Sequence, residues 1–534
     1  MNSAPERARW LLISWIVLAL ITVGAAALRL YRLDQPLWTD ELHTAWIASG
    51  PLSEVAWRAE MGNQGPLFYY VEWLFGRVFG VSEITMRLMS VLAGVALVPM
   101  AYGLVLRWTG RPWAGLLAAA LAAVDVDFLF YAQEARPYAC VQLLAALHVI
   151  VFWRLLNRPT TALRATWVVG AALLFYLHYT AILIVVAELI AYGVLRCVPR
   201  LRPVYRPTHA AIDGAIAVLL MLPATGHLAA IFARRGNWEA LVGTDWPVSL
   251  KRMAGVYVLV PAALVFASAI GKRLISQPAE RASEQHHTAD TIAPDKQAHF
   301  RGWVLVACWA ILPVGFAWMA TYVNFARLFM LRYVIGSALG AIVAAGISCA
   351  LYRSSAARAA AMLVVLAMAL YTSPIARDLI NERKLRGERT DDWRSAVEHL
   401  NKSGGELPVL VAAGLIDSDD LRQPHDERRR QYCLFPVLSI YRLDRDGREM
   451  APLPWTSPGL LSPESMALIV EHGGAWVMIR GTPQYVREAE ADLLDLLNAD
   501  GMSARITETL WFGTVAVLRV EVSVELLAAG GVLQ

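Results

Sequence analysis

The stretch WLLISWIVLALITVGAAAL, residues 10–28, contains nineteen consecutive residues without a charged side chain. A helix of this length spans roughly 30 Å, the thickness of the hydrocarbon core of a bilayer. Small residues near its end fit a signal peptide, but the run is longer than the roughly 7–15 apolar residues of a typical signal core. We therefore expect a retained first membrane-spanning helix.

The whole chain has the composition of a polytopic α-helical membrane protein. Of its 534 residues, 57% are hydrophobic and 17% are charged, whereas about a quarter of the residues of a soluble protein are charged. The net charge of +4 is dispersed over short loops, so a nucleic-acid partner is not expected. Length and hydropathy predict about eleven spans, at residues 10–28, 88–106, 113–130, 139–156, 165–178, 180–196, 210–230, 253–270, 302–320, 333–351 and 358–375.

The arginines of the short loops indicate the orientation. They gather on the side of the N-terminus, for example at Arg107, Arg111, Arg154 and Arg158, where acidic residues are nearly absent. The positive-inside rule places this side in the cytoplasm. We therefore predict a multi-pass protein of the inner (cytoplasmic) membrane whose C-terminal region is extracytoplasmic.

The composition changes after about residue 376, where charged residues become frequent and apolar runs shorten. We predict a transmembrane domain at 1–375, with a first extracytoplasmic loop at 29–87, and a mixed α/β domain at 376–534. Asp391 or Asp392 is expected to cap the first helix of the second domain. Its predicted helices are 393–400 and 488–501, and its predicted strands are 407–413, 475–480 and 513–522.

The first predicted loop contains two adjacent acids, Asp40 and Glu41, in LDQPLWTDELHT, residues 33–44. A helix over this segment would place Asp40, His43 and Thr44 on one face. If that helix lies on the membrane, Trp46 and Ile47 would face lipid. The structural alternative is a helix cap, with Thr39 as the N-cap and the acids favourably placed in the first turn. This segment alone leaves both interpretations open.

Four further motifs follow along the chain, GPLFYY at 65–70, RLMSVLAG at 87–94, YAQEARPYA at 131–139 and RLFMLRY at 327–333. Together with the acidic pair, they resemble the GT-C-type membrane glycosyltransferases of the family 39 or RgtA-like group. This group is related to protein O-mannosyltransferases and aminoarabinose transferases. The resemblance covers about residues 10–375.

The resemblance implies transfer of a sugar from a polyprenyl-phosphate carrier to an acceptor on the outer face of the membrane. The acceptor would be a lipid, a glycan or a protein. Asp40 would be the catalytic base, with Glu41 beside it, and Glu134 would be a second acidic position on the outer face. The chain departs from its relatives at 63–66, where Asn-Gln-Gly-Pro stands in place of the usual His or Pro before the PL.

This chemistry suits the residue types. A hydroxyl or amine acceptor needs a base as the new bond forms, and one carboxylate supplies it. Attack from the face opposite the leaving group inverts the anomeric centre. The departing lipid phosphate needs positive charge, and a guanidinium matches phosphate oxygens in a bidentate way. The candidate phosphate-binding residues are Arg136, Arg327, Arg332, Tyr333 and Arg87.

Some of these candidates also have a structural interpretation. Arg136 could pair with Glu134, and Arg332 with its tyrosine neighbour could be an ordinary interface anchor. A divalent metal ion, held by Glu134 and His178 together with Asp40, is a further prediction. His178 is otherwise a polar residue of helix packing.

A different class of function is a polytopic transporter or lipid flippase. Such a protein would place charged residues inside its spans, and Glu188 is the main residue of this kind here. A third class is a non-catalytic assembly or sensor protein that acts through its C-terminal region. We favour the glycosyltransferase, because the informative charges collect at one membrane face.

Overall fold

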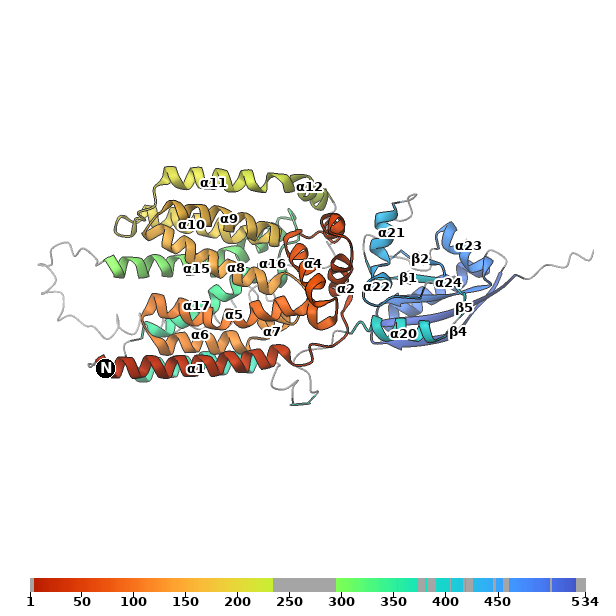
Figure 1. Ribbon diagram of the computed structural model, residues 1–534, viewed down its shortest axis with the longest axis horizontal. Coiled ribbons are helices and arrows are strands. Elements are labelled where there is room, and N and C mark those ends of the chain that lie inside the picture. The colour runs from red at the N-terminus through yellow and green to blue at the C-terminus, as the bar shows by residue number, and fades with distance from the viewer. Residues whose placement is uncertain are drawn as a thin grey trace, which may run out of the picture. The chain divides into compact units, whose positions relative to one another are not determined.

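The computed structural model describes residues 4–233, 294–352, 354–372, 380–381, 390–403, 405–415, 418, 426–444, 448–454, 461–499 and 502–524. The chain forms two compact units (Figure 1). The first comprises Met1–Leu33, Asn63–Phe68 and Arg87–Gly387, and the second comprises Asp34–Gly62, Tyr69–Met86 and Glu388–Gln534. Most of the predicted first loop thus groups with the C-terminal residues rather than with the spans.

The first unit consists of long apolar helices. Seven stretches of helix among the described residues are long and apolar enough to cross a membrane, and a pair bent by 59° would add an eighth. These are Arg9–Leu30, Glu83–Thr109, Tyr138–Asn157, Tyr179–Cys197, Pro207–Ala233, Lys296–Tyr322 and Leu331–Ala350, with the bent pair Pro112–Val124 and Val126–Ala132. The predicted class of multi-pass α-helical membrane protein is therefore confirmed.

The individual elements of this unit are α1 (Ala4–Leu30), α5 (Glu83–Thr109), α6 (Pro112–Val124), α7 (Val126–Ala132), α8 (Tyr138–Asn157), α9 (Thr161–Leu177), η2 (Tyr179–Ala181), α10 (Ile182–Cys197), η3 (Pro199–Leu201), α11 (Pro207–Met221), η4 (Leu222–Ala224), α12 (Thr225–Ala233), α15 (Pro294–Tyr322), α16 (Leu331–Val334), η7 (Ile335–Ser337), α17 (Ala338–Ala350) and α18 (Ser355–Thr372). The predicted spans at 165–178 and 358–375 correspond to α9 and α18, which are shorter apolar helices. The span predicted at 253–270 lies outside the described residues, so the count of eleven stays a prediction.

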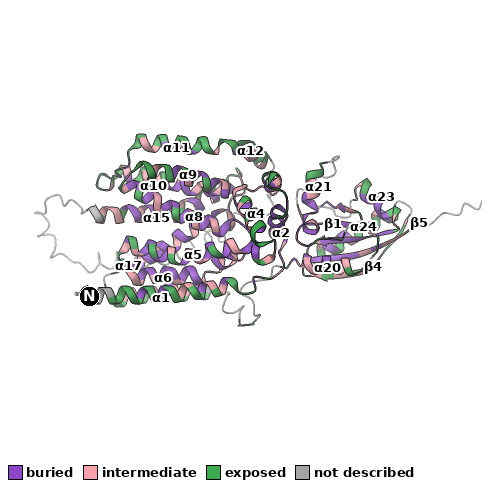
Figure 2. Cartoon of the chain, in the orientation of Figure 1, coloured by how far each residue is buried: buried purple, intermediate pink, exposed green. Residues whose placement is uncertain are grey.

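Small residues let these helices approach closely. A Cβ added at Gly115 of α6 would lie 2.8 Å from the ring of Tyr102 on α5, and one added at Gly340 of α17 would lie 2.9 Å from Trp309 on α15. Such positions are typical of helix interfaces in membranes. Large apolar side chains are instead exposed on the outside of the helices, as Figure 2 shows for α1, where Leu20 is 67% exposed. A surface of this kind suits contact with lipid.

The second unit is built on a five-stranded mixed sheet with strand order β2-β1-β3-β5-β4. β1 pairs in parallel with β2 and β3, whereas β5 pairs antiparallel with β3 and β4. The predicted mixed α/β region is therefore confirmed. The strands are β1 (Val409–Ala412), β2 (Met450–Pro452), β3 (Gly474–Arg480), β4 (Met502–Phe512) and β5 (Val515–Val524).

Helices cover both faces of this sheet. On one face, Val477 and Leu518 share a core with α23 (Pro463–Glu471) and α24 (Pro483–Ala499). On the other face, α20 (Trp393–Ser403) packs on β4 and β5. The remaining helical elements of this unit are α2 (Thr39–Ser49), η1 (Leu52–Glu54), α3 (Val55–Met61), α4 (Leu67–Phe79), of which Tyr69–Phe79 falls in this unit, α21 (Glu427–Cys433) and α22 (Phe435–Leu438).

Candidate functional site

The acidic pair lies in the first turn of α2. This helix starts at Thr39, after Trp38 in an extended conformation. Glu41 is fully buried, and its Oε2 accepts a hydrogen bond from the Trp38 N–H at 3.4 Å. Asp40 is partly exposed. Of the two acids, Glu41 therefore serves the start of the helix, and Asp40 is the one that a substrate can reach more easily.

The prediction that Thr39 is the N-cap of this helix is wrong. Thr39 is the first helical residue, and both its N–H and its hydroxyl donate to Oδ2 of Asp391, at 3.3 and 2.8 Å. The same carboxylate accepts from Nε of Arg480 and from the hydroxyl of Thr514, each at 2.6 Å. Asp391 thus joins the start of α2 to the end of β3 and the start of β5.

Burial opposes the ionisation of Asp391, but the charge of Arg480 and the hydrogen bonds from Thr514 and Thr39 outweigh it and lower the pKa of this carboxyl. The cap of α20 is its neighbour Asp392, whose Oδ1 accepts the Ser395 N–H at 3.0 Å. Sequence analysis offered either acid as the cap. A helix has a single N-cap, so the presence of two adjacent acids already indicated that one of them, here Asp391, has another role.

The prediction that Trp46 faces lipid is also wrong. Trp46 is only 2% exposed and belongs to a cluster of rings. His43, one turn earlier on α2, lies 5.4 Å from the ring of Tyr432 and 5.5 Å from that of Phe435. Its Nε2 lies 2.9 Å from the carbonyl oxygen of Arg58. The amphipathic face of α2 is therefore covered by protein, from α21 and α22.

In the first unit, the structure brings two of the predicted arginines around His178. Burial and then the positive charges of Arg136 and Arg332 lower the pKa of His178, which lies between α9 and η2, to about 3. Nδ1 of His178 lies 2.8 Å from the hydroxyl of Thr180, and this hydroxyl donates to the carbonyl of Tyr333 at 2.8 Å. The hydroxyl therefore accepts from an Nδ1–H, and the imidazole is neutral.

The other predicted phosphate ligands have different surroundings. Arg332 lies over the ring of Tyr333, with Cζ 5.4 Å from its centre. Arg327 is half-buried between α15 and α16. Arg87 is fully buried, and its Nη1 donates to the carbonyl of Leu33 at 2.7 Å. At least one N–H of Arg87 therefore holds the chain just after α1.

The predicted metal site lacks a ligand set in the part of the chain that the structure describes. No three His, Cys, Asp or Glu side chains gather there closely enough to hold an ion. The two cations near His178 make its surroundings unfavourable for another positive charge. The metal ion stays a prediction, and no reaction step is assigned to it.

Glu188, the acid inside a predicted span, is enclosed by polar partners. Its Oε1 lies 2.9 Å from Nδ1 of His148, and its Oε2 accepts from Nε1 of Trp167 at 2.8 Å. Nε2 of His148 lies 3.0 Å from the carbonyl of Trp167. All three residues are buried. This closed set of hydrogen bonds ties α8, α9 and α10 together.

Sequence analysis missed one buried acid, Glu72 of α4. It is fully buried, and neither carboxylate oxygen has a hydrogen-bond partner among the described residues. Burial raises its pKa well above the ordinary value of 4.5. The signal was present in the sequence, because GPLFYYVEWLFG places a single acid in a helix that is otherwise aromatic and aliphatic.

With this geometry in place, comparison with known proteins points to one family. The family model of dolichyl-phosphate-mannose-protein mannosyltransferases matches residues 63–227. This range contains the GPLFYY and YAQEARPYA motifs with Arg136 and His178, whereas Asp40 and RLFMLRY lie outside it. The chain is similar to that family over this range. The resemblance indicated by the motifs is therefore confirmed.

Two similar solved structures are crystal structures of ArnT from Cupriavidus metallidurans. The one bound to undecaprenyl phosphate is 14% identical, with a TM-score of 0.47, and the match covers 97% of this chain and 98% of that one. The apo state is 13% identical, with a TM-score of 0.41 and coverage of 96% and 98%. No curated protein matches the chain.

Proposed function

We propose that this protein is a membrane glycosyltransferase. It takes a hexose or pentose from a polyprenyl-phosphate donor and transfers it to a hydroxyl or amine on the outer face of the cytoplasmic membrane. The observation that carries the proposal is the family match over residues 63–227, because the same range contains Arg136 and His178, which lie close together in the structure.

The roles follow from charge and exposure. Asp40 accepts the proton of the incoming nucleophile as the glycosidic bond forms at the anomeric carbon and the bond to the lipid phosphate breaks, with inversion. Arg136 and Arg332 stabilise the departing phosphate, because guanidinium groups bind phosphate oxygens strongly. The neutral His178 near these arginines adds no charge, and its Nε2 is a hydrogen-bond acceptor because Nδ1–H is donated to Thr180. Arg327 and Tyr333 complete the proposed phosphate site. In this proposal the second unit lies on the extracytoplasmic side of the membrane.

The transporter or flippase is the competing proposal, and the surroundings of Glu188 count against it. A residue that carries a substrate or proton through a span needs access to a cavity. Both carboxylate oxygens of Glu188 instead have partners, and His148 and Trp167 are buried with it. This arrangement suits a structural role.

The test is an assay of sugar transfer with the reconstituted full-length protein. The donors are undecaprenyl-phosphate-linked mannose, glucose and aminoarabinose, the acceptor is a lipid and glycan extract of bacterial envelopes, and the readout is the release of undecaprenyl phosphate. Asp40→Asn should lower the rate about 10²–10⁴-fold, the usual contribution of a general base. The matched control is Asp34→Asn, which removes an exposed carboxylate from the same loop.

Full activity of the Asp40→Asn protein would remove the proposed base. Lipid movement across the vesicle bilayer, without consumption of any of the three donors, would support the flippase instead.

A further inference from the structure

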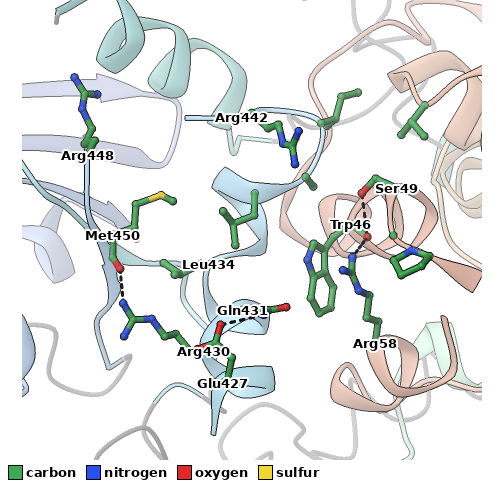
Figure 3. Close-up of a pocket in the computed structure, with 16 residues that line it drawn as sticks. Trp46, Ser49, Arg58, Glu427, Arg430, Gln431, Leu434, Arg442, Arg448 and Met450 are labelled. Atoms are coloured by element: carbon green, nitrogen blue, oxygen red, sulfur yellow. Dashed lines mark hydrogen bonds between the residues drawn. The ribbon is translucent and has the colours of Figure 1, made fainter. Parts of the chain in front are cut away.

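The second unit contains a pocket of about 790 Å³ (Figure 3). Trp46, Ser49 and Arg58 of the first loop form one side, and residues of α21, α22 and the chain up to β2 form the other. The lining residues are Trp46, Ser49, Gly50, Pro51, Arg58, Val81, Glu427, Arg430, Gln431, Leu434, Leu438, Ser439, Ile440, Arg442, Arg448 and Met450. A volume of this size suits a small-molecule ligand or the headgroup of a larger one.

Positive charge dominates the lining, with four arginines and one glutamate. Two of these arginines have structural partners. Arg58 pairs with Glu54 at 2.6 Å, and Arg430 pairs with Glu464 and donates to the carbonyl of Met450 at 2.8 Å. Their charges are therefore largely compensated within the fold.

The other two arginines differ from this pair. Arg448 donates to the backbone carbonyls of Leu400 and Gly405, at 3.1 and 2.9 Å, and these contacts hold its side chain in place. The side chain of Arg442 is exposed and makes no hydrogen bond or ion pair within the described residues. Arg442 can therefore bind an anion without first giving up a partner.

A buried hydroxyl points to a ligand independently of the charges. Ser439 lines the pocket and is only 5% exposed, and its Oγ has no hydrogen-bond partner among the described residues. An unsatisfied buried hydroxyl costs about 1–3 kcal/mol, so a ligand oxygen at this position would be favourable. Leu434, Leu438 and Ile440 line the same pocket with apolar surface.

We propose that this pocket binds the acceptor of the glycosyl transfer and that the acceptor is a saccharide bearing a phosphate group. The inference rests on the proposed function. The phosphate oxygens accept hydrogen bonds from Arg442 and Ser439, with the charge of Arg448 nearby, and the apolar side chains contact the saccharide. A guanidinium with two free N–H groups suits phosphate in particular.

The position of the pocket on α2 adds a size requirement. Asp40 is in the first turn of this helix, and Ser49 is its last residue and lines the pocket. Nine residues of helix rise about 14 Å. Trp46 lines the pocket as well, six residues or about 9 Å along the helix from Asp40. An acceptor that occupies this pocket and reacts at Asp40 is therefore expected to be larger than a monosaccharide.

The experiment measures binding by calorimetry to the full-length protein in detergent. The probe is N-acetylglucosamine 1-phosphate, and the other arms are N-acetylglucosamine, inorganic phosphate and glucuronic acid. We expect the phosphorylated sugar to bind more tightly than each of the other three. Arg442→Gln should weaken its binding about 5–10-fold, because one charge-assisted contact is lost at an exposed position. Arg487→Gln, which removes an exposed arginine from α24 of the same unit, should leave it unchanged.

The proposal is overturned if the wild-type protein does not bind the probe at millimolar concentration. It is equally overturned if Arg442→Gln binds as well as wild type, or if the neutral sugar binds as tightly as its phosphate. If glucuronic acid binds more tightly than N-acetylglucosamine 1-phosphate, the pocket prefers a carboxylate, and the proposal of a phosphate-bearing acceptor is overturned. Asp40→Asn should bind the probe normally. Binding that depends on Arg442 in a protein that consumes none of the donors would support the anionic pocket and reject the glycosyltransferase.

Discussion

Replacing Asp391 by Asn tests whether this carboxylate holds the start of α2, and with it the proposed base. The wild-type carboxylate accepts four hydrogen bonds, two from Thr39 and one each from Arg480 and Thr514, and it is only 4% exposed. The amide has a single acceptor oxygen and two donor N–H groups. The donors from Thr39 and Arg480 all bond to Oδ2, whereas Thr514 bonds to Oδ1. An amide oxygen in place of Oδ2 therefore leaves the Thr514 hydroxyl opposite an N–H group, and the substitution also removes the negative charge that compensates Arg480.

The size of the effect follows from burial. Breaking a buried ion pair on one side costs about 3–5 kcal/mol. Because 30% of the Arg480 side chain is exposed and water can solvate part of its charge, we take the lower end, about 3 kcal/mol. For a unit of this size, that loss corresponds to a fall of about 6–12 °C in Tm.

The assay is thermal unfolding of the full-length protein in detergent, followed by tryptophan fluorescence, together with the rate of sugar transfer. Asp392→Asn is the matched control, because Asn caps a helix about as well as Asp does and Tm should change little. Both readouts should fall in Asp391→Asn. A Tm for Asp391→Asn within about 1–2 °C of the control would refute the role assigned to this carboxylate.

The same pair of variants has a defined pH dependence. The pKa of Asp391 is lower in the folded protein than its ordinary value of 3.8, so the folded state favours the ionised form. This stabilisation is complete above about pH 5 and is lost as the pH falls through the folded-state pKa. The difference in Tm between wild type and Asp391→Asn should therefore be constant at neutral pH and should close in acid.

Two further predictions concern residues away from this carboxylate. Because burial raises the pKa of Glu72, the folded protein binds a proton that the unfolded chain releases, and stability should fall as the pH rises above about 4.5. Glu72→Gln should remove this slope and be at least as stable as wild type at pH 8; an unchanged slope in thermal unfolding would contradict the assignment. A Cβ at Gly65 would lie 2.3 Å from the carbonyl oxygen of Tyr176, so Gly65→Ala should cost about 1–3 kcal/mol and lower Tm. Gly103→Ala, with nothing within 4 Å of the added Cβ, is the control, and equal Tm values for the two variants would count against this close contact.

Strands that contain a long apolar run could be predicted from the sequence. The strands β1 and β3 are nearly continuous apolar runs because both faces of a central strand are covered. The strand β5, VAVLRVEVSV, begins with such a run and then alternates. The strand β4 was not predicted, although its sequence MSARITETLWF alternates polar with less polar residues, which is the pattern of a half-buried strand. Its residues alternate between exposed and half-buried, as expected for an edge strand with one solvated face.

Some residues of the candidate site could be predicted from the sequence, and others could not. Arg136 and Arg332 were predicted because they lie in recognisable motifs, and the structure places both near His178. The role of Asp391 was not predicted, because its partner Thr39 is 352 residues away in the sequence. Trp46 was misplaced for a related reason: an amphipathic helix shows which face is apolar but not whether lipid or protein covers it.

The contacts of the second unit also decide which experiment separates an enzyme from a protein that acts only through its C-terminal region. Besides the bonds to Asp391, the N–H of Leu37 donates to the hydroxyl of Tyr441 at 2.9 Å, and this hydroxyl donates to Glu83 at 3.0 Å. The C-terminal residues therefore hold the segment just before Asp40 at two points. Deleting them would disturb the acidic pair in either case, so loss of function after deletion fits both interpretations. Asp40→Asn leaves both attachments in place, and it is the substitution whose effect only the enzyme predicts.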